Sequence, residues 1–121
     1  MVIDDEKDVL AVVKRGLEYN DFLVDAFDNP VEAIAAFSQK PSDYYDMVLL
    51  DVRMPQMTGY EVYRIMRQMN KHLQICFMTA QENLEDDFRR IFPDDMLDCV
   101  VRKPTKLANL IRFVEGRLNV K

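Results

Sequence analysis

Short β-like runs alternate with amphipathic helical runs five times along this chain. The predicted strands are MVID (1–4), FLVDAF (22–27), MVLLD (47–51), QICFMT (74–79) and CVVRK (99–103). The last three are mostly continuous apolar runs, as expected of parallel strands that are covered on both faces. Because crossovers between parallel strands are nearly always right-handed, this alternation predicts an α/β fold with a doubly wound, five-stranded parallel sheet.

The predicted helices between these strands carry apolar residues at helical spacing. The second begins at Asn29-Pro30, an N-cap followed by proline at the first helical position. The third begins with Thr58 and Glu61 in the spacing of a capping box. The apolar stripes of the first, third, fourth and fifth helices are Val9, Leu10, Val12, Val13 and Leu17; Val62, Ile65, Met66 and Met69; Leu84, Phe88, Ile91 and Phe92, cut off by Pro93; and Leu107, Leu110, Ile111, Val114 and Leu118.

Composition narrows the classes of protein that fit this pattern. A chain of 121 residues predicts one domain over residues 1–121, and a net charge of −5 argues against sequence-independent binding of nucleic acid. No apolar run approaches a membrane span, so we expect no membrane partner and a cytoplasmic location. Cys76 and Cys99 lack metal-ligand spacing, and we expect buried, reduced thiols rather than a disulfide. The single histidine, His72, is expected on the surface.

Polar residues stand where four of the predicted strands end. The first strand ends at Asp4-Asp5, the third at Asp51, the fourth at Thr79 and the fifth at Lys103. Ligands of parallel α/β sheets bind outside the carboxyl ends of the strands, so we expect these side chains to share one crevice. Taken singly, each is more often a turn former or a helix cap. Their combination at four strand ends favours a functional site.

Three carboxylates in one crevice repel each other, by about 4 kcal/mol for a pair at 4 Å and an effective dielectric near 20. One lysine offsets only part of that repulsion, whereas Mg²⁺ prefers carboxylate oxygens and water as ligands. A metal ion, a lysine and a hydroxyl together suit a phosphoryl group. An ionised aspartate is itself a nucleophile, so the site needs no separate general base.

The segments VIDDE, LLDVRMPQMTG, FMTA and VRKP resemble the signature positions of response-regulator receiver domains, the phosphorylated modules of two-component signalling. The match covers essentially the whole chain. Within the family, the chain is similar to the single-domain, chemotaxis-type regulators. The resemblance implies a flavodoxin-like fold with strand order 2-1-3-4-5. It also implies that residues 1–121 form one receiver domain.

The resemblance implies a role for each residue at the strand ends. Asp51 would be the phosphoacceptor of a phosphorelay, phosphorylated by a histidine kinase or phosphotransfer protein. Thr79 would be the switch hydroxyl, and Lys103 would bind the phosphoryl oxygen. The Mg²⁺ ligands would be Asp5, Asp51 and the backbone carbonyl of Arg53, with Asp4 acting through water.

The resemblance extends to the turns around the site and to partners. Pro55 and Gly59 match the turn after the phosphoacceptor, and a cis bond is expected before Pro104. The expected partners are a kinase and a downstream protein target or output domain, with a homodimer through the fourth and fifth helices as a candidate assembly. The module would not be an enzyme beyond its own phosphoryl transfer and autodephosphorylation.

Two alternative functions remain open at this point. An aspartyl phosphohydrolase would commonly carry a second acid two residues after the nucleophile, where this chain has Arg53. A pseudo-receiver, a protein-binding module that phosphorylation does not switch, is favoured by Val100, which stands where receivers usually have an aromatic residue. If Val100 rules out the usual aromatic movement, signalling would use backbone shifts around Thr79 and Pro104 or another partner face.

Three further features are unusual for the resemblance. The segment 82–98 is long, and IFPDDMLD replaces the usual small residues before the fifth strand, so we expect irregular structure there. The first strand has only Met1, Val2 and Ile3 before its acids, a short run for a central strand, which leaves two alternatives: residues are missing upstream, or the start of the chain was assigned too late. Arg53 and Gln81 stand two residues after Asp51 and Thr79, where the family modulates access of the hydrolytic water. We therefore expect the phosphoryl lifetime to depend on Arg53.

Overall fold

Five strands and five helices alternate along the chain in the computed structural model, which describes residues 1–118. The strands are β1 (Val2–Ile3), β2 (Ala26–Phe27), β3 (Met47–Leu50), β4 (Gln74–Thr79) and β5 (Cys99–Arg102). The helices are α1 (Lys7–Tyr19), α2 (Pro30–Ser38), α3 (Gly59–Met69), α4 (Leu84–Ile91) and α5 (Leu107–Arg117). All five strands are parallel in the order β2-β1-β3-β4-β5, which confirms the predicted fold class and strand order.

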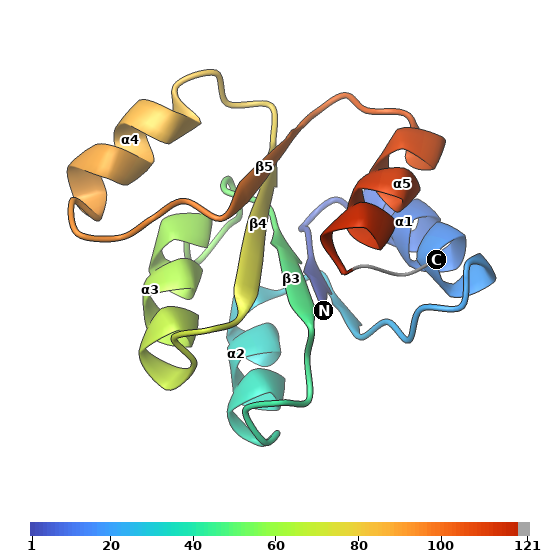
Figure 1. The fold of residues 1–121 in the computed structure, drawn as a ribbon, viewed down its shortest axis with the longest axis horizontal. Coiled ribbons are helices and arrows are strands. Elements are labelled where there is room, and N and C mark those ends of the chain that lie inside the picture. Colours follow the sequence, from blue (N-terminus) through green and yellow to red (C-terminus); the bar gives the residue numbers. More distant parts are fainter. Residues whose placement is uncertain (119–121) are drawn as a thin grey trace.

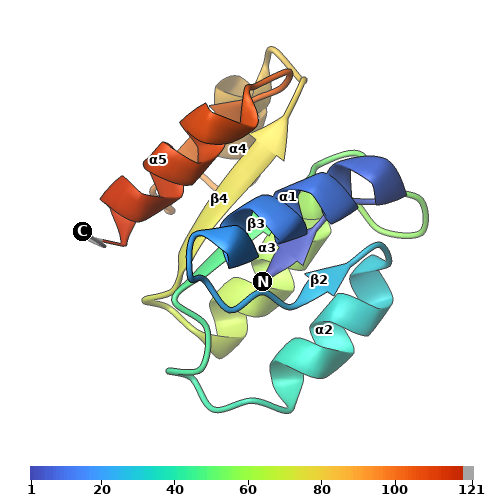
Figure 2. The same cartoon turned by 90° about the vertical axis from the view of Figure 1, so that its right-hand side faces the viewer.

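Helices cover both faces of the sheet (Figures 1 and 2). Helices α1 and α5 lie on one face, and α2, α3 and α4 lie on the other. Successive residues of β3 and β4 alternate between the two core layers: Val48 and Phe77 face α3, whereas Leu49 and Met78 face α1 and α5. This burial on both faces explains why these strands read as continuous apolar runs.

Strand β2 is shorter than predicted. The sequence pattern indicated a strand over 22–27, but only Ala26–Phe27 are paired. The reason is that β2 is an edge strand whose one neighbour is β1, and the pairing there begins with Val2 opposite Ala26. A strand residue needs a paired neighbour, so the apolar pattern of 22–25 alone does not extend the ladder.

The helix starts follow the predicted capping chemistry. The Asn29 side chain accepts hydrogen bonds from the N–H groups of Val31 and Glu32, and Thr58 forms the complete capping box with Glu61. Not every stripe residue is buried, however. Val12, which the periodicity assigned to the core, is 54 % exposed on α1, whereas Val13 and Leu17 of the same stripe are buried.

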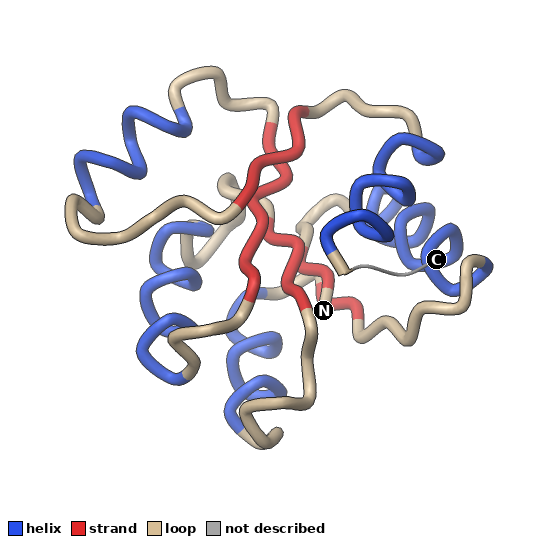
Figure 3. The backbone as a smooth tube through the Cα atoms, viewed as in Figure 1, coloured by secondary structure: helices blue, strands red, loops and turns tan. Residues whose placement is uncertain are grey.

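The segment before β5 is irregular, as expected, but a polar network holds it. Helix α4 has only eight residues, and a loop runs from its end to β5 (Figure 3). In that loop the carboxylate of Asp98 accepts hydrogen bonds from Arg67 at 2.7 Å and from the backbone N–H of Ile75 at 3.0 Å. Asp95 accepts another from Tyr63 at 3.0 Å. The acidic loop is thereby attached to α3 and β4.

Cys76 and Cys99 form a disulfide, which corrects the expectation of reduced thiols. The two residues face each other in the β4–β5 ladder, with their Cα atoms 4.6 Å apart and both side chains in the core layer under α1 and α5. That separation lies within the range that a disulfide spans. Sequence spacing does not reveal strand register, so this pairing could not be seen from the sequence.

None of the helices within residues 1–118 is both long enough and apolar enough to cross a lipid bilayer.

Candidate functional site at the carboxyl ends of the strands

Asp51 directly follows β3 at the carboxyl end of the sheet. The residue is only 7 % exposed, and one carboxylate oxygen accepts a hydrogen bond from the Val52 N–H at 2.9 Å. The four residues of β3 are all buried, two in each core layer. The strand therefore holds the carboxylate in a rigid position.

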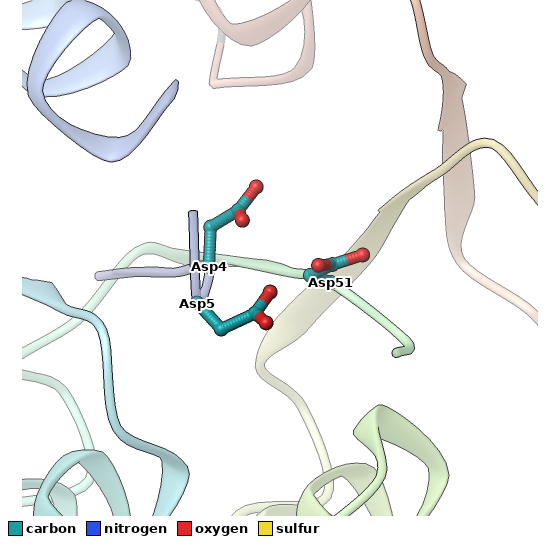
Figure 4. Close-up of side chains that lie close together, drawn as sticks. All are labelled: Asp4, Asp5 and Asp51. Carbon is teal, nitrogen blue, oxygen red and sulfur yellow. The ribbon is translucent and has the colours of Figure 1, made fainter. Parts of the chain in front are cut away.

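Asp4 and Asp5 reach the same place from β1. The backbone N–H of Asp51 donates to the carbonyl of Ile3 at 3.0 Å, so the ends of β1 and β3 lie side by side. Carboxylate oxygens of Asp4, Asp5 and Asp51 all lie within 4.8 Å of one another. Figure 4 shows the three side chains lying close together at these two strand ends. The convergence predicted from the sequence is therefore present.

Lys103 brings the positive charge to this group from the end of β5. Its Nζ lies 2.6 Å from Asp4 Oδ2 and 3.8 Å from Asp51 Oδ2. Glu6, which the sequence analysis did not select, lies 3.7 Å from the same nitrogen. Burial alone would lower the pKa of Lys103, but the hydrogen bond to Asp4 and the charges of Asp51, Asp4 and Glu6 raise it overall. The lysine is therefore charged at neutral pH.

The carboxylates of Asp4, Asp5 and Asp51 together carry more negative charge than Lys103 can balance. Burial raises the pKa of Asp51 to about 7; Lys103 lowers it, and the neighbouring charges of Asp4 and Asp5 raise it further. A buried carboxylate is costly unless a cation or hydrogen-bond donors meet it, and one ammonium does not balance three carboxylates. Closely spaced carboxylate oxygens are the donor set that Mg²⁺ prefers. The residues present thus fit a magnesium ion.

Thr79 ends β4 between β3 and β5. Its side chain is buried, and its hydroxyl oxygen accepts a hydrogen bond from the Gln81 N–H at 3.0 Å. The backbone N–H of Lys103 donates to the Thr79 carbonyl at 2.8 Å, so the ends of β4 and β5 are adjacent. All four predicted strand ends therefore meet at one edge of the sheet.

The capping alternative for the acids at the start of the chain is correct in part. Asp4 accepts a hydrogen bond from the Glu6 N–H at 2.9 Å, which forms a turn ahead of α1. The N-cap of α1 is Glu6, however, and no side chain caps that helix. Asp4 is completely buried against Lys103, so its turn hydrogen bond is not its sole contact. The Asp4 carboxylate therefore stabilises the turn ahead of α1 and also belongs to the candidate site.

Gly59 serves the site through lack of a side chain. It lies in the turn after Asp51, as the resemblance implied, and none of the three glycines has a positive φ. A Cβ on Gly59 would lie 2.2 Å from the backbone oxygen of Asp51. The Gly59 N–H also donates to the Val52 carbonyl at 2.8 Å. The start of α3 is thus packed directly on the backbone of the site.

The other loop residues behave in different ways. The Lys103–Pro104 peptide bond is cis, as predicted. Arg53, two residues beyond Asp51, has an exposed side chain. His72 is exposed, as expected. Tyr60, which the sequence pattern did not single out, also lies here, and its hydroxyl accepts a hydrogen bond from the Gln81 side chain at 3.1 Å. Its sole signal in the sequence was a tyrosine on the capped first turn of a helix.

A family model and several sequence relatives match nearly the whole chain. The family model for the response regulator receiver domain matches residues 1–115. The transcriptional regulatory protein PrrA of Mycobacterium tuberculosis is 30 % identical over 119 residues, which cover 98 % of this chain and 48 % of PrrA. The response regulator MprA of Mycobacterium avium is 31 % identical over 118 residues, which cover 98 % of this chain and 50 % of MprA. The chain thus spans about half the length of these relatives.

Solved structures share the fold. The response regulator TrrA of Thermotoga maritima, crystallised in complex with Mg²⁺ and BeF, has a TM-score of 0.78 at 28 % identity, covering 96 % of this chain and 95 % of TrrA. A CheY-like receiver domain protein of Methanospirillum hungatei has a TM-score of 0.83 at 19 % identity, covering 98 % of this chain and 90 % of its own. The second likeness concerns the fold alone.

Proposed function

Because this chain belongs to the response regulator receiver domain family, we propose that Asp51 is its phosphoacceptor and that phosphorylation depends on Mg²⁺. The observation that carries this proposal is the meeting of three carboxylates and one lysine at the strand ends. A cation at this site would favour the ionised form of Asp51, and an ionised aspartate held by a rigid strand can attack a phosphoryl group without a separate base. The proposed donor is a phosphohistidine on a kinase or phosphotransfer protein.

Each residue of the site has a proposed role that follows from its position. Asp5, Asp51 and the backbone carbonyl of Arg53 would hold Mg²⁺, with Asp4 acting through water. The ion, when bound, would neutralise charge on the phosphoryl oxygens. Lys103 would bind one phosphoryl oxygen as a point charge, and Thr79 would offer its hydroxyl to another.

The resulting module is a switch and not an enzyme acting on an external substrate. Phosphorylation would shift an equilibrium between two conformations and change which protein binds. We propose that residues 1–121 form one receiver domain in the cytoplasm, that its partners are a kinase and a downstream protein or output domain, and that a homodimer through α4 and α5 is one candidate assembly. No membrane or nucleic acid is a proposed direct partner.

The test is intact mass after incubation with acetyl phosphate and Mg²⁺. We expect a gain of one phosphoryl group, about 80 Da, that is lost with EDTA and in Asp51→Asn. The matched control is Asp94→Asn, which changes an exposed carboxylate outside the site. Absence of any gain, under conditions that label another receiver, would support the pseudo-receiver alternative that Val100 favours.

Arg53 provides a second measurement on the same site. Its exposed side chain stands two residues beyond Asp51, where a guanidinium can pair with phosphoryl oxygens or shield them from water. We expect Arg53→Ala to change the lifetime of the phosphorylated protein, measured by the decay of the mass increment after the donor is removed. An unchanged decay rate would show that Arg53 is a solvated surface residue.

A further inference from the structure

Gln81 connects the carboxyl end of β4 to three other elements. Its backbone N–H donates to the hydroxyl oxygen of Thr79 at 3.0 Å. Its side-chain nitrogen donates both to the Tyr60 hydroxyl, at 3.1 Å, and to the carboxylate of Asp87 on α4. Its carbonyl accepts a hydrogen bond from Arg102 of β5. A single residue thus links the switch hydroxyl to α3, α4 and β5.

Tyr60 supplies an aromatic ring next to this connection. It lies in the first turn of α3, with its ring centroid 5.7 Å from that of Phe77 on β4. Val100 pairs with Phe77 from β5 and packs on the same core layer. Burial and the charge of Asp87 raise the pKa of Tyr60, so its hydroxyl stays protonated at neutral pH. Tyr60 therefore combines a ring anchored in the core with a polar end at the β4–α4 connection, which Val100 does not offer.

Two side chains in the first turn of α4, Glu85 and Asp87, bond to residues outside the helix. The helix has eight residues, and its N-cap, Asn83, makes no side-chain capping hydrogen bond. Leu84 and Phe88 are its buried side chains, and Arg90 pairs with Asp87 on the outer face. Glu85 pairs with Arg102 of β5, and Asp87 holds the same turn, through Gln81, to the hydroxyl of Tyr60.

We propose that the Tyr60–Gln81–Asp87 bridge couples the state of Thr79 to the placement of α4, an inference that rests on the proposed phosphorylation of Asp51. When the Thr79 side chain rotates to bring its hydroxyl to a phosphoryl oxygen, the hydroxyl oxygen moves away from the Gln81 N–H and that hydrogen bond breaks. Gln81 then moves, and the hydrogen bonds of its side chain to Tyr60 and Asp87 break or change partners. Tyr60 and Gln81 act as positioning residues, because neither touches the reacting atoms.

If the Tyr60–Gln81–Asp87 bridge only supported the fold, the response of α4 to phosphorylation would differ from that of a coupling bridge. A static bridge would hold α4 equally in the unphosphorylated and phosphorylated states, so its removal would loosen α4 without altering the response to phosphorylation. A coupling bridge has two arrangements, one for each state of Thr79. The change at α4 on activation, measured separately from stability, therefore distinguishes the two roles.

The experiment records amide NMR shifts in the wild type, Tyr60→Phe and Gln81→Met, before and after addition of beryllofluoride and Mg²⁺. Tyr60→Phe keeps the ring on Phe77 and removes the hydroxyl alone. We expect the activation-induced shifts of residues 84–91 to fall by about half or more in both variants, whereas those around Asp51 and Thr79 persist. The matched control is Tyr63→Phe on the same helix, which removes a hydroxyl that bonds Asp95 in another loop; it should keep the full response at α4.

Undiminished shifts at α4 in Tyr60→Phe and Gln81→Met, with binding at Asp51 intact, would overturn the inference and leave the proposed function standing. An equal loss in Tyr63→Phe would also overturn it, because any loosening of α3 would then have the same effect. If the wild type itself shows no change at Asp51, the proposed function fails, and this inference with it.

Discussion

At the scale of single residues, the surroundings of Asp51 make ionisation of its carboxyl group costly. Burial raises its pKa to about 7 from an ordinary value of 3.8. In the pH range between these values the folded protein keeps the proton and the unfolded chain releases it. The unfolded state therefore binds fewer protons there, and the free energy of unfolding falls as pH rises.

We expect this loss to be on the order of 2–4 kcal/mol between about pH 4 and 7 in the absence of divalent cations. The measurement is urea denaturation in EDTA across this range, for the wild type and Asp51→Asn. The variant cannot ionise at this position, so the difference in stability between the two proteins should grow with pH in the variant's favour. Added Mg²⁺ should reduce that difference, because a cation stabilises the ionised carboxylate. A difference that does not vary with pH would contradict the shifted pKa.

At the scale of elements, the approach of α3 to the site depends on a missing side chain. We expect Gly59→Ala to destabilise the fold by about 2–4 kcal/mol, because its Cβ would lie 2.2 Å from the Asp51 backbone oxygen, which cannot move without displacing β3. Gly116→Ala is the control: a Cβ there meets no atom within 4 Å, and alanine favours the helix by about 0.5–1 kcal/mol. Thermal denaturation of both variants measures the contrast, and equal effects would refute it.

A second prediction at this scale concerns the loop between α4 and β5. Asp98→Ala would leave Arg67 and the N–H of Ile75 without the carboxylate that they share. We expect a loss of about 2–3 kcal/mol in the free energy of unfolding, since the remaining partners are largely buried. Asp94→Ala, an exposed change in the same loop, should cost less than about 0.5 kcal/mol. Comparable losses in the two variants would show that the network contributes little.

At the scale of the whole molecule, the disulfide between Cys76 and Cys99 closes a loop that contains α4. The sequence separation is 23 residues, for which the chain-entropy estimate is a stabilisation of about 3 kcal/mol. We expect protein purified without reductant to show no free thiol when titrated in denaturant, and we expect reduction to lower its stability. A variant with Cys76→Ala and Cys99→Ala should be insensitive to reductant. Two titratable thiols in the untreated protein would instead support the reduced state expected of a cytosolic protein.

Much of this molecule could be predicted from local pattern. The alternation of strands and helices, the caps at Asn29 and Thr58 and the strand-end positions of Asp51, Thr79 and Lys103 follow from periodicity and short-range chemistry. Parallel strands joined by right-handed crossovers leave their carboxyl ends at one edge. Residues far apart in sequence could therefore be assigned to one site before any distance was known.

Tertiary structure alone decided which side chains meet at short range. The register of β4 against β5 set Cys76 opposite Cys99, and the register of β1 against β2, which starts with Val2 opposite Ala26, limited β2 to two residues. The packing of α3 brought Tyr60 to Gln81 and the backbone of Asp51 to Gly59. The physical reason is that periodicity identifies the buried face of an element, whereas register and packing between elements depend on contacts that only the assembled chain makes.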